Sequence, residues 1–141
     1  MSIYADTSFF VSLYLPDRYS AEAERRTASK PRIWLTPLHI AEWTHAVSQH
    51  VFRKEISVRE AGMAHAELEL DCENGLWLEV DLPESVWRTC AQLARKHGPK
   101  LGSRTLDSLH VAAAVELGAK SFWTFDERQA KLAVAEGLST S

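Results

Sequence analysis

The sequence predicts an α/β fold in which a mostly parallel sheet is covered by helices on both faces. Two observations predict it: four short apolar segments typical of strands, and longer segments with helical periodicity between them. Strands that alternate with helices favour parallel pairing, because each crossover helix returns the chain to the same edge of the sheet. With 141 residues, 45% of them hydrophobic, the chain is expected to form one domain, residues 1–141, around a substantial core.

The first half of the chain is expected to form two strands and four helices. Pro16 separates the first two helices, since proline removes a backbone donor inside a helix. Thr36 followed by Pro37 is a typical helix start, and Ser57 with Glu60 has the spacing of a capping box. In chain order we expect a strand at 3–5, helices at 8–15 and 17–29, a strand at 32–35, and helices at 37–53 and 57–74.

The second half is expected to form two strands and three helices. Pro83 opens a helix that ends near residue 97, before a loop at 98–102 that contains glycine and proline. Gly118 ends the following helix, because glycine readily adopts the left-handed conformation of a helix C-terminus. The expected elements are strands at 76–80 and 121–125 and helices at 83–97, 104–118 and 126–136.

Composition excludes several classes of protein. No apolar run approaches the ~20 residues of a membrane span, and the N-terminus lacks the basic start of a signal peptide, so we expect a cytoplasmic protein without membrane contact. Cys72 and Cys90 are too few for a disulfide framework or a zinc site and are expected to be reduced. The net charge of −3 argues only weakly against nucleic-acid binding, because four acids held in a metal site would leave a nearly neutral remainder.

Asp107 stands where helical periodicity predicts a hydrophobic residue. In the helix at 104–118, an apolar arc includes Leu106, Val111 and Ala114, and Asp107 falls inside it. The opposite side is expected to carry Thr105, Ser108, Ala112 and Glu116. A carboxylate on a buried face is costly unless it is paired, hydrogen-bonded or bound to a metal, so a partner is expected for it.

Asp6 and Asp126 each directly follow an expected strand. Ligands of open parallel sheets bind at the carboxyl ends of the strands, so these two acids and Asp107 can share one pocket. Each also has a structural interpretation, because Asp6 and Asp126 are suitable helix N-caps, and acids in a first helical turn are stabilised by the helix dipole. Glu42 is expected from periodicity to face solvent, opposite the inner stripe of its helix.

Three or four carboxylates in one crevice predict a divalent cation. They repel one another unless cations neutralise them, and hard oxygen ligands without a set of Cys or His suit Mg²⁺, with Mn²⁺ as an alternative. Such an ion can activate a water molecule and stabilise charge on a phosphoryl oxygen. Hydrolysis of a phosphodiester is the reaction that this set of residues suits best.

Four stretches of the chain resemble the PIN-domain ribonucleases, and in particular the VapC-type toxins of type II toxin–antitoxin pairs. They are YADTSFFVSLYLPD (4–17), TPLHIAEW (36–43), SRTLDSLHVAAA (103–114) and FWTFDERQAKLA (122–133), which follow the order of the family over essentially the whole chain. The resemblance implies a PIN-like three-layer α/β/α fold with a mostly parallel central sheet of four to five strands.

The resemblance also implies site residues and partners. The family's acidic quartet falls, in chain order, on Asp6, Glu42, Asp107 and Asp126. The first and third are implied to be the principal metal ligands, and the other two complete the site or orient water. Ser8 and Thr124 match small hydroxyl positions near the family's site. A homodimer is implied as well, and so is an antitoxin whose C-terminal segment obstructs the acidic pocket.

Cations that could bind an RNA backbone are expected before the Asp107 helix. Arg104 stands at its start, and Arg95, Lys96 and Lys100 lie shortly before, so a basic surface that binds RNA is one interpretation. The other interpretation is that these residues simply solvate helix ends and loops.

Two other functions remain open. A Mg²⁺-dependent phosphatase or phosphotransferase would form an aspartyl-phosphate at Asp6, although Ser8 stands where such sites usually carry a second acid. A non-catalytic α/β binding module would use the acids only as caps and surface charge. Replacing Asp107 by asparagine separates the nuclease from the binding module, because only the nuclease would lose activity.

Overall fold

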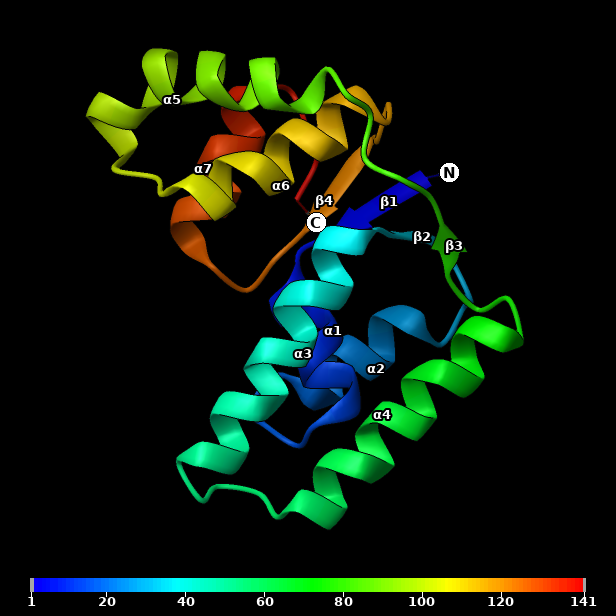
Figure 1. Ribbon diagram of the computed structural model, residues 1–141. Coiled ribbons are helices and arrows are strands. Elements are labelled where there is room, and N and C mark those ends of the chain that lie inside the picture. The colour runs from blue at the N-terminus through cyan, green and yellow to red at the C-terminus, as the bar shows by residue number, and fades with distance from the viewer. Residues whose placement is uncertain (1, 141) are drawn as a thin grey trace. The chain divides into compact units, whose positions relative to one another are not determined.

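The computed structural model describes residues 2–140, and within this range strands alternate with helices (Figure 1). The four strands form parallel pairs, β1 with β4 and β2 with β3, so the expected α/β fold with mostly parallel strands is confirmed. The chain divides into two compact units. The first unit consists of the residues up to Asp6 and those from Asp81 onward, and the second unit is Thr7–Val80.

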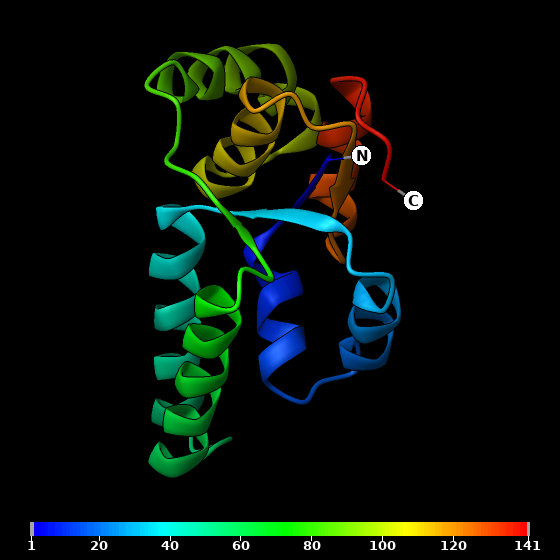
Figure 2. The ribbon, with the colours of Figure 1, turned by 90° about the vertical axis from the view of Figure 1, so that its right-hand side faces the viewer.

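In the first unit, β1 (Ser2–Ala5) lies beside β4 (Ser121–Trp123), with Tyr4 opposite Phe122 in the register (Figure 2). Both strands are almost completely buried, as is typical of apolar segments in a parallel sheet. The rings of Tyr4 and Phe122 stack with their centroids 5.6 Å apart, and the Tyr4 hydroxyl lies 2.7 Å from Nδ1 of the buried His110. β4 ends at Trp123 rather than at residue 125, so residues 124–125 connect it to the next helix.

Three helices complete the first unit: α5 (Val86–Leu101), α6 (Thr105–Glu116) and α7 (Glu127–Ala135). The expectation of a loop from residue 98 is wrong, because α5 continues through Gly98 and Pro99 to its end. Proline is tolerated there, since it removes only one backbone donor close to the end of the helix. Gly102 then adopts a φ of 64°, the left-handed conformation that ends helices.

In the second unit, β2 (Arg32–Leu35) pairs with β3 (Leu78–Glu79), which is shorter than the strand expected at 76–80. Beyond the end of β3, the Val80 N–H still donates to the Leu35 carbonyl at 3.1 Å. The core of this unit is aromatic. The Phe10 ring contacts His39 and Trp77 edge to face, with centroids 5.2 Å and 5.1 Å away.

The helices of the second unit are α1 (Thr7–Tyr14), α2 (Ser20–Thr27), α3 (Pro37–Phe52) and α4 (Val58–Glu73). Both helix starts expected from capping patterns are confirmed. The Thr36 hydroxyl accepts from the His39 N–H at 3.4 Å, and Ser57 with Glu60 makes both hydrogen bonds of a capping box at 3.0 Å. Between residues 2 and 140, none of the helices combines the length and apolarity needed to span a bilayer.

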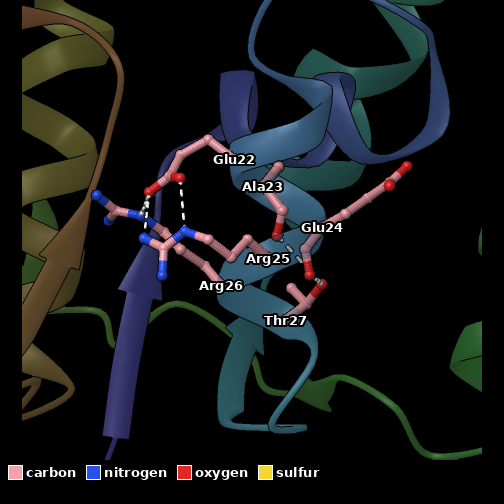
Figure 3. Close-up of polar contacts among 6 residues, drawn as sticks. All are labelled: Glu22, Ala23, Glu24, Arg25, Arg26 and Thr27. Atoms are coloured by element: carbon pink, nitrogen blue, oxygen red, sulfur yellow. Dashed lines mark hydrogen bonds and ion pairs between the residues drawn. The ribbon is translucent and has the colours of Figure 1, made fainter.

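A cluster of charges stabilises α2 on its exposed face. Figure 3 shows the Glu22 carboxylate facing the guanidinium groups of Arg25 and Arg26. The nearest N–O distances are 2.6 Å to Arg25 and 2.9 Å to Arg26. These hydrogen bonds favour the ionised carboxylate and lower the pKa of Glu22 to about 2. The charge of Glu22 is therefore compensated by cations about one turn further along the same helix.

Candidate acidic site

Asp6 lies at the carboxyl end of β1, as expected. Its N–H donates to the Trp123 carbonyl at 3.0 Å, so the hydrogen bonding between β1 and β4 continues to this residue. Asp6 is only 6% exposed, and its Oδ2 accepts a hydrogen bond from the Thr124 hydroxyl at 3.0 Å. Backbone and side-chain hydrogen bonds thus hold this carboxylate at the end of a strand, the position where ligands of parallel sheets bind.

Asp126 begins α7 and does not directly follow β4. Its Oδ1 accepts the N–H of Gln129 at 3.0 Å, which makes Asp126 the N-cap of the helix, so the capping interpretation is confirmed. The expectation that Asp126 immediately follows a strand is wrong, because β4 is shorter than expected. The Asp126 N–H donates to the Thr124 hydroxyl at 3.0 Å. Thr124 therefore connects Asp126 with Asp6.

Asp107 is the third residue of α6, and its side chain is 17% exposed. Oδ2 accepts the Arg104 N–H at 3.1 Å, and Arg104 Nε lies 3.8 Å from the same oxygen. The expected apolar arc is only partly right, because Leu106 is 47% exposed whereas Ser108 and Ala112, expected on the opposite side, are buried. The reason is that α6 packs against both α5 and α7, which buries its middle on more than one side.

Glu42 and Ser8 belong to the second unit. Glu42 lies on α3 and is half-buried, and the Thr7 hydroxyl donates to its Oε1 at 2.7 Å. The solvent-facing side chain expected from periodicity is therefore only partly right. Ser8 is exposed in the first turn of α1. Glu42 is thus hydrogen-bonded to Thr7, the residue that directly follows Asp6 in the chain.

The donor chemistry of the acidic residues fits a hard divalent cation. Asp6, Asp107 and Asp126 offer carboxylate oxygens, and an N–H or O–H donor orients each of them through one oxygen. Among residues 2–140, no group of three or more His, Cys, Asp or Glu side chains is already placed to hold a metal ion.

The basic residues expected near the acids have different environments. The Arg104 side chain is 80% exposed beside Asp107. On α5, Lys96 Nζ lies 3.6 Å from Glu136 Oε2, an oxygen that His97 Nε2 also contacts at 2.7 Å. Lys96 is therefore engaged in an ion pair on its own unit, whereas Arg104 presents an exposed guanidinium next to an acidic residue.

Gln129 is a residue of this site that the sequence analysis missed. It is 2% exposed, and its Oε1 lies 3.0 Å from the Thr124 hydroxyl while its Nε2 donates to the Asp107 carbonyl at 3.4 Å. One signal in the sequence points to it, because Gln129 shares a helical face with Leu132 and Ala133, where an apolar residue is expected. Thr124 and Gln129 together link the three aspartates of the first unit.

The chain resembles several solved structures of other proteins. VapC20 of Mycobacterium tuberculosis, described as a Sarcin–Ricin loop cleaving toxin, has a TM-score of 0.71 and 20% identity over 99% of this chain and 98% of that chain. VapBC2 from Rickettsia felis, bound to a DNA fragment from their promoter, has a TM-score of 0.65 and 18% identity over 100% of this chain and 98% of that chain. FitAcB from Neisseria gonorrhoeae has a TM-score of 0.73 and 17% identity over 99% of this chain and 96% of that chain. At these identities the likeness shows a shared fold.

A family model gives a more specific assignment than the shared fold. None of the curated proteins compared with the chain matches it. The model described as the PIN domain matches residues 3–135, a range that begins in β1 and includes all seven helices of the described chain. The expected resemblance is confirmed at this level, and the chain belongs to the PIN domain family.

Proposed function

We propose that the chain is a Mg²⁺-dependent endoribonuclease, active also with Mn²⁺, that serves as the toxin of a toxin–antitoxin pair. Membership of the PIN domain family supports a nuclease. The observation that carries the proposal is the hydrogen-bond network through Thr124 and Gln129, which connects three aspartates from separate segments of the chain. Within this network the Thr124 hydroxyl orients the Asp6 carboxylate and the Gln129 N–H orients the Asp126 carboxylate, and outer hydrogen bonds of this kind are typical of metal sites.

In this proposal Asp6 and Asp107 are the principal metal ligands, and Glu42 and Asp126 complete the site or orient water. When bound, the cation supplies positive charge that stabilises the phosphoryl group and activates water for hydrolysis. The chain's own residues prepare the ligands. The Thr124 hydroxyl holds Asp6, the Arg104 N–H holds Asp107, and the Thr7 hydroxyl orients Glu42, which can accept a proton from the attacking water.

RNA is the proposed substrate, and VapC20, described as a toxin that cleaves the Sarcin–Ricin loop, supports this choice. The exposed guanidinium of Arg104 is suited to bind phosphate oxygens with two parallel hydrogen bonds. Ser8 is exposed, so a phosphate of the substrate can reach it. Thr124 contributes to substrate binding indirectly, since its hydroxyl lies 3.0 Å from Asp6.

The proposed partners are a second copy of the chain and a cognate antitoxin. Support for the antitoxin comes from two solved structures of similar fold, VapBC2 bound to a DNA fragment from their promoter and FitAB bound to an IR36 DNA fragment. A basic side chain of the antitoxin would reach the acidic site and neutralise its carboxylates, which would block the cation and inhibit cleavage. A cytoplasmic location is part of the proposal, since the RNA substrate and the antitoxin are intracellular.

The test is to sequence the RNA ends that the wild-type chain generates in the presence of Mg²⁺ and to compare them with those from Asp6→Asn. The asparagine keeps an oxygen that can accept the Thr124 proton but removes the charge that a cation needs. We expect defined ends from the wild type that disappear with Asp6→Asn and with EDTA. Identical ends from the variant would contradict the proposal.

A parallel assay separates the nuclease from the phosphatase. Wild-type protein is incubated with a phosphomonoester and with RNA under the same Mg²⁺ concentration. We expect RNA cleavage without release of phosphate from the monoester. Monoester hydrolysis without RNA cleavage would favour an aspartyl-phosphate at Asp6, and neither activity would favour the binding module.

A further inference from the structure

We propose that the exposed face of α5 binds single-stranded RNA, with an unpaired base stacked on Trp87 and backbone phosphates bound by Arg88 and Arg95. This inference rests on the proposed function and adds a binding surface to it. α5 packs against α6 and α7 through a buried side that includes Val86 and Leu93. The other side of the helix carries Trp87 and the two arginines, and all three are exposed.

Trp87 differs from the other tryptophans of the chain. It is 61% exposed, whereas the other four are each at most 9% exposed. Burial of an indole normally stabilises a fold, so a tryptophan that remains in water is more informative than a buried one. Its ring offers a flat surface on which a base can stack, and aromatic stacking is the usual way in which proteins hold unpaired bases.

The charge of α5 is suited to a polyanion. The helix contains four of the 16 Lys and Arg residues of the chain and none of its 19 acidic residues. Lys96 is paired with Glu136, but within residues 2–140 neither Arg88 nor Arg95 makes a hydrogen bond or an ion pair through its side chain. These two arginines are seven residues apart, so they project from the same side of the helix, about 10 Å apart along its axis.

The acidic site lies toward one end of this face, within the same unit. α5 and α6 run side by side in opposite directions (Figure 1), and the Thr89 hydroxyl near the start of α5 donates to Glu116 at the end of α6 at 3.1 Å. The end of α5 is therefore close to the start of α6, where Arg104 and Asp107 are. Trp87 lies about 20 Å before the end of α5, so it would hold a nucleotide away from the bond that is cleaved.

RNA fits this face better than a second copy of the chain does. A symmetric contact between two copies brings the same patch of each together, so the α5 arginines would meet arginines, with no acid on α5 to compensate them. A different protein partner would have to supply an acid for each arginine. A single strand of RNA supplies a phosphate at every nucleotide and bases that are free to stack.

The experiment measures binding of a fluorescein-labelled single-stranded oligoribonucleotide to the full chain by anisotropy, in EDTA so that the RNA is not cleaved. Trp87→Ala should lower the affinity about tenfold, and Trp87→Phe, which keeps a ring, should lower it less. Arg95→Gln should lower the affinity and reduce the slope of log affinity against log salt concentration by about 0.7, the value for one phosphate of a single strand. Unchanged affinity in Trp87→Ala and an unchanged slope in Arg95→Gln would overturn the inference.

Matched controls are available in the second unit. Phe52 is 82% exposed, and Arg59 is exposed on α4, in a segment whose charges are of both signs. Phe52→Ala and Arg59→Gln therefore remove a similar ring and a similar cation, and both should leave RNA affinity and its salt dependence unchanged. Losses equal to those of Trp87→Ala and Arg95→Gln would mean that any exposed ring or cation contributes, and would overturn the inference.

Tryptophan fluorescence reports on the contact directly, because Trp87 is exposed and the other four tryptophans are buried. Acrylamide should quench the wild type strongly without RNA and more weakly when the oligoribonucleotide is saturating. Trp87→Phe should show weak quenching in both conditions. Quenching of the wild type that is unaffected by saturating RNA would contradict stacking on this ring.

Cleavage kinetics with Mg²⁺ distinguish failure of this inference from failure of the proposed function. Trp87→Ala should raise KM for RNA and leave kcat near the wild-type value, because the ring contacts a nucleotide away from the reacting bond. Cleavage with an unchanged KM would reject this inference alone. A wild type that neither binds nor cleaves RNA would reject the proposed function, and this inference with it. Intact RNA affinity in Trp87→Ala with loss of a dimer in sedimentation would assign the face to a protein contact.

Discussion

Two carboxylates at the same helical position, Glu22 and Asp107, have opposite surroundings. Each is the third residue of its helix, α2 for Glu22 and α6 for Asp107. The Glu22 side chain is 37% exposed and has two guanidinium groups within 2.9 Å, whereas the Asp107 side chain is 17% exposed and has one at 3.8 Å. The carboxylate with less access to water therefore has less positive charge beside it.

This difference separates a structural acid from a candidate functional one. Glu22 is stabilised within its own helix by water and by two arginines, whose hydrogen bonds lower its pKa. Asp107 is oriented by a backbone N–H, while the arginine beside it extends into solvent. A partly buried charge with weak compensation is costly to the folded state, and a bound cation would remove that cost.

The largest expected effect comes from neutralising each acid in turn. Asp107→Asn keeps an acceptor for the Arg104 N–H but loses the charge, so Mg²⁺-dependent RNA cleavage should fall by more than about 100-fold, beyond what loss of an outer partner costs. Glu22→Gln should leave cleavage unchanged. Initial rates on the same RNA, measured with both purified variants, check this.

Stability provides the control for that pair of variants. Without metal, Asp107→Asn should have a free energy of unfolding equal to or above that of the wild type, because a poorly compensated charge is gone. Urea denaturation in the presence of EDTA measures it. Equal activity of Asp107→Asn and wild type would place Asp107 with Glu22 among the structural acids and would favour the binding module.

The second expected effect is stabilisation by metal. At a Mg²⁺ or Mn²⁺ concentration about 100 times the dissociation constant, a single site adds about 2.7 kcal/mol to the free energy of unfolding, which raises the thermal midpoint by several degrees. Wild type and Glu22→Gln should show this rise, and Asp107→Asn should lose most of it. Thermal scans with and without the ion provide the measurement. A rise of the same size in all three proteins would mean that the ion binds elsewhere.

The third effect extends the comparison to two helix caps. Asp126 caps α7 and Ser57 caps α4, each through one side-chain oxygen and an N–H at 3.0 Å. Replacing either residue by alanine should lower the free energy of unfolding by about 1 kcal/mol. Only Asp126→Ala should also lower Mg²⁺-dependent cleavage, whereas Ser57→Ala should not.

Asparagine at position 126 sharpens this test, because asparagine caps helices as well as aspartate does but carries no charge. Asp126→Asn should therefore keep the stability of the wild type and still lose cleavage. Loss of stability in Asp126→Ala together with full activity of both variants at 126 would show that this acid is only a cap.

The sequence allowed the order of the strands and helices to be predicted, because apolar periodicity and capping residues act locally. Thr36, Ser57 and Glu60 mark helix starts that the structure confirms. The ends of the elements were less predictable. Whether α5 continues through Pro99 depends on packing against its neighbours, and no local rule decides it.

The candidate site was predictable in its acids but not in the residues that connect them. Asp107 attracts attention because a charge among apolar neighbours needs a partner, yet the burial of Ser108 and Ala112 depends on two helices packing around α6. Gln129 carries no charge and matches no metal-binding pattern. Its role follows from the hydrogen bonds of its side chain to the Thr124 hydroxyl and to the Asp107 carbonyl, which no periodicity encodes.

The smallest expected effect is the pH dependence that Glu22 gives to stability. Its pKa is lowered from 4.5 to about 2 in the folded chain, so the contribution of Glu22 is fully present above about pH 5 and is lost as pH falls toward 2. The stability difference between wild type and Glu22→Gln should therefore shrink over this range. Urea denaturation between about pH 6 and pH 3 measures it, and roughly 0.5 M salt should reduce the difference at pH 6, because an exposed ion pair is screened. If the difference in stability between wild type and Glu22→Gln did not depend on pH or salt, Glu22 would contribute through packing. Charge compensation would then not be what distinguishes Glu22 from Asp107.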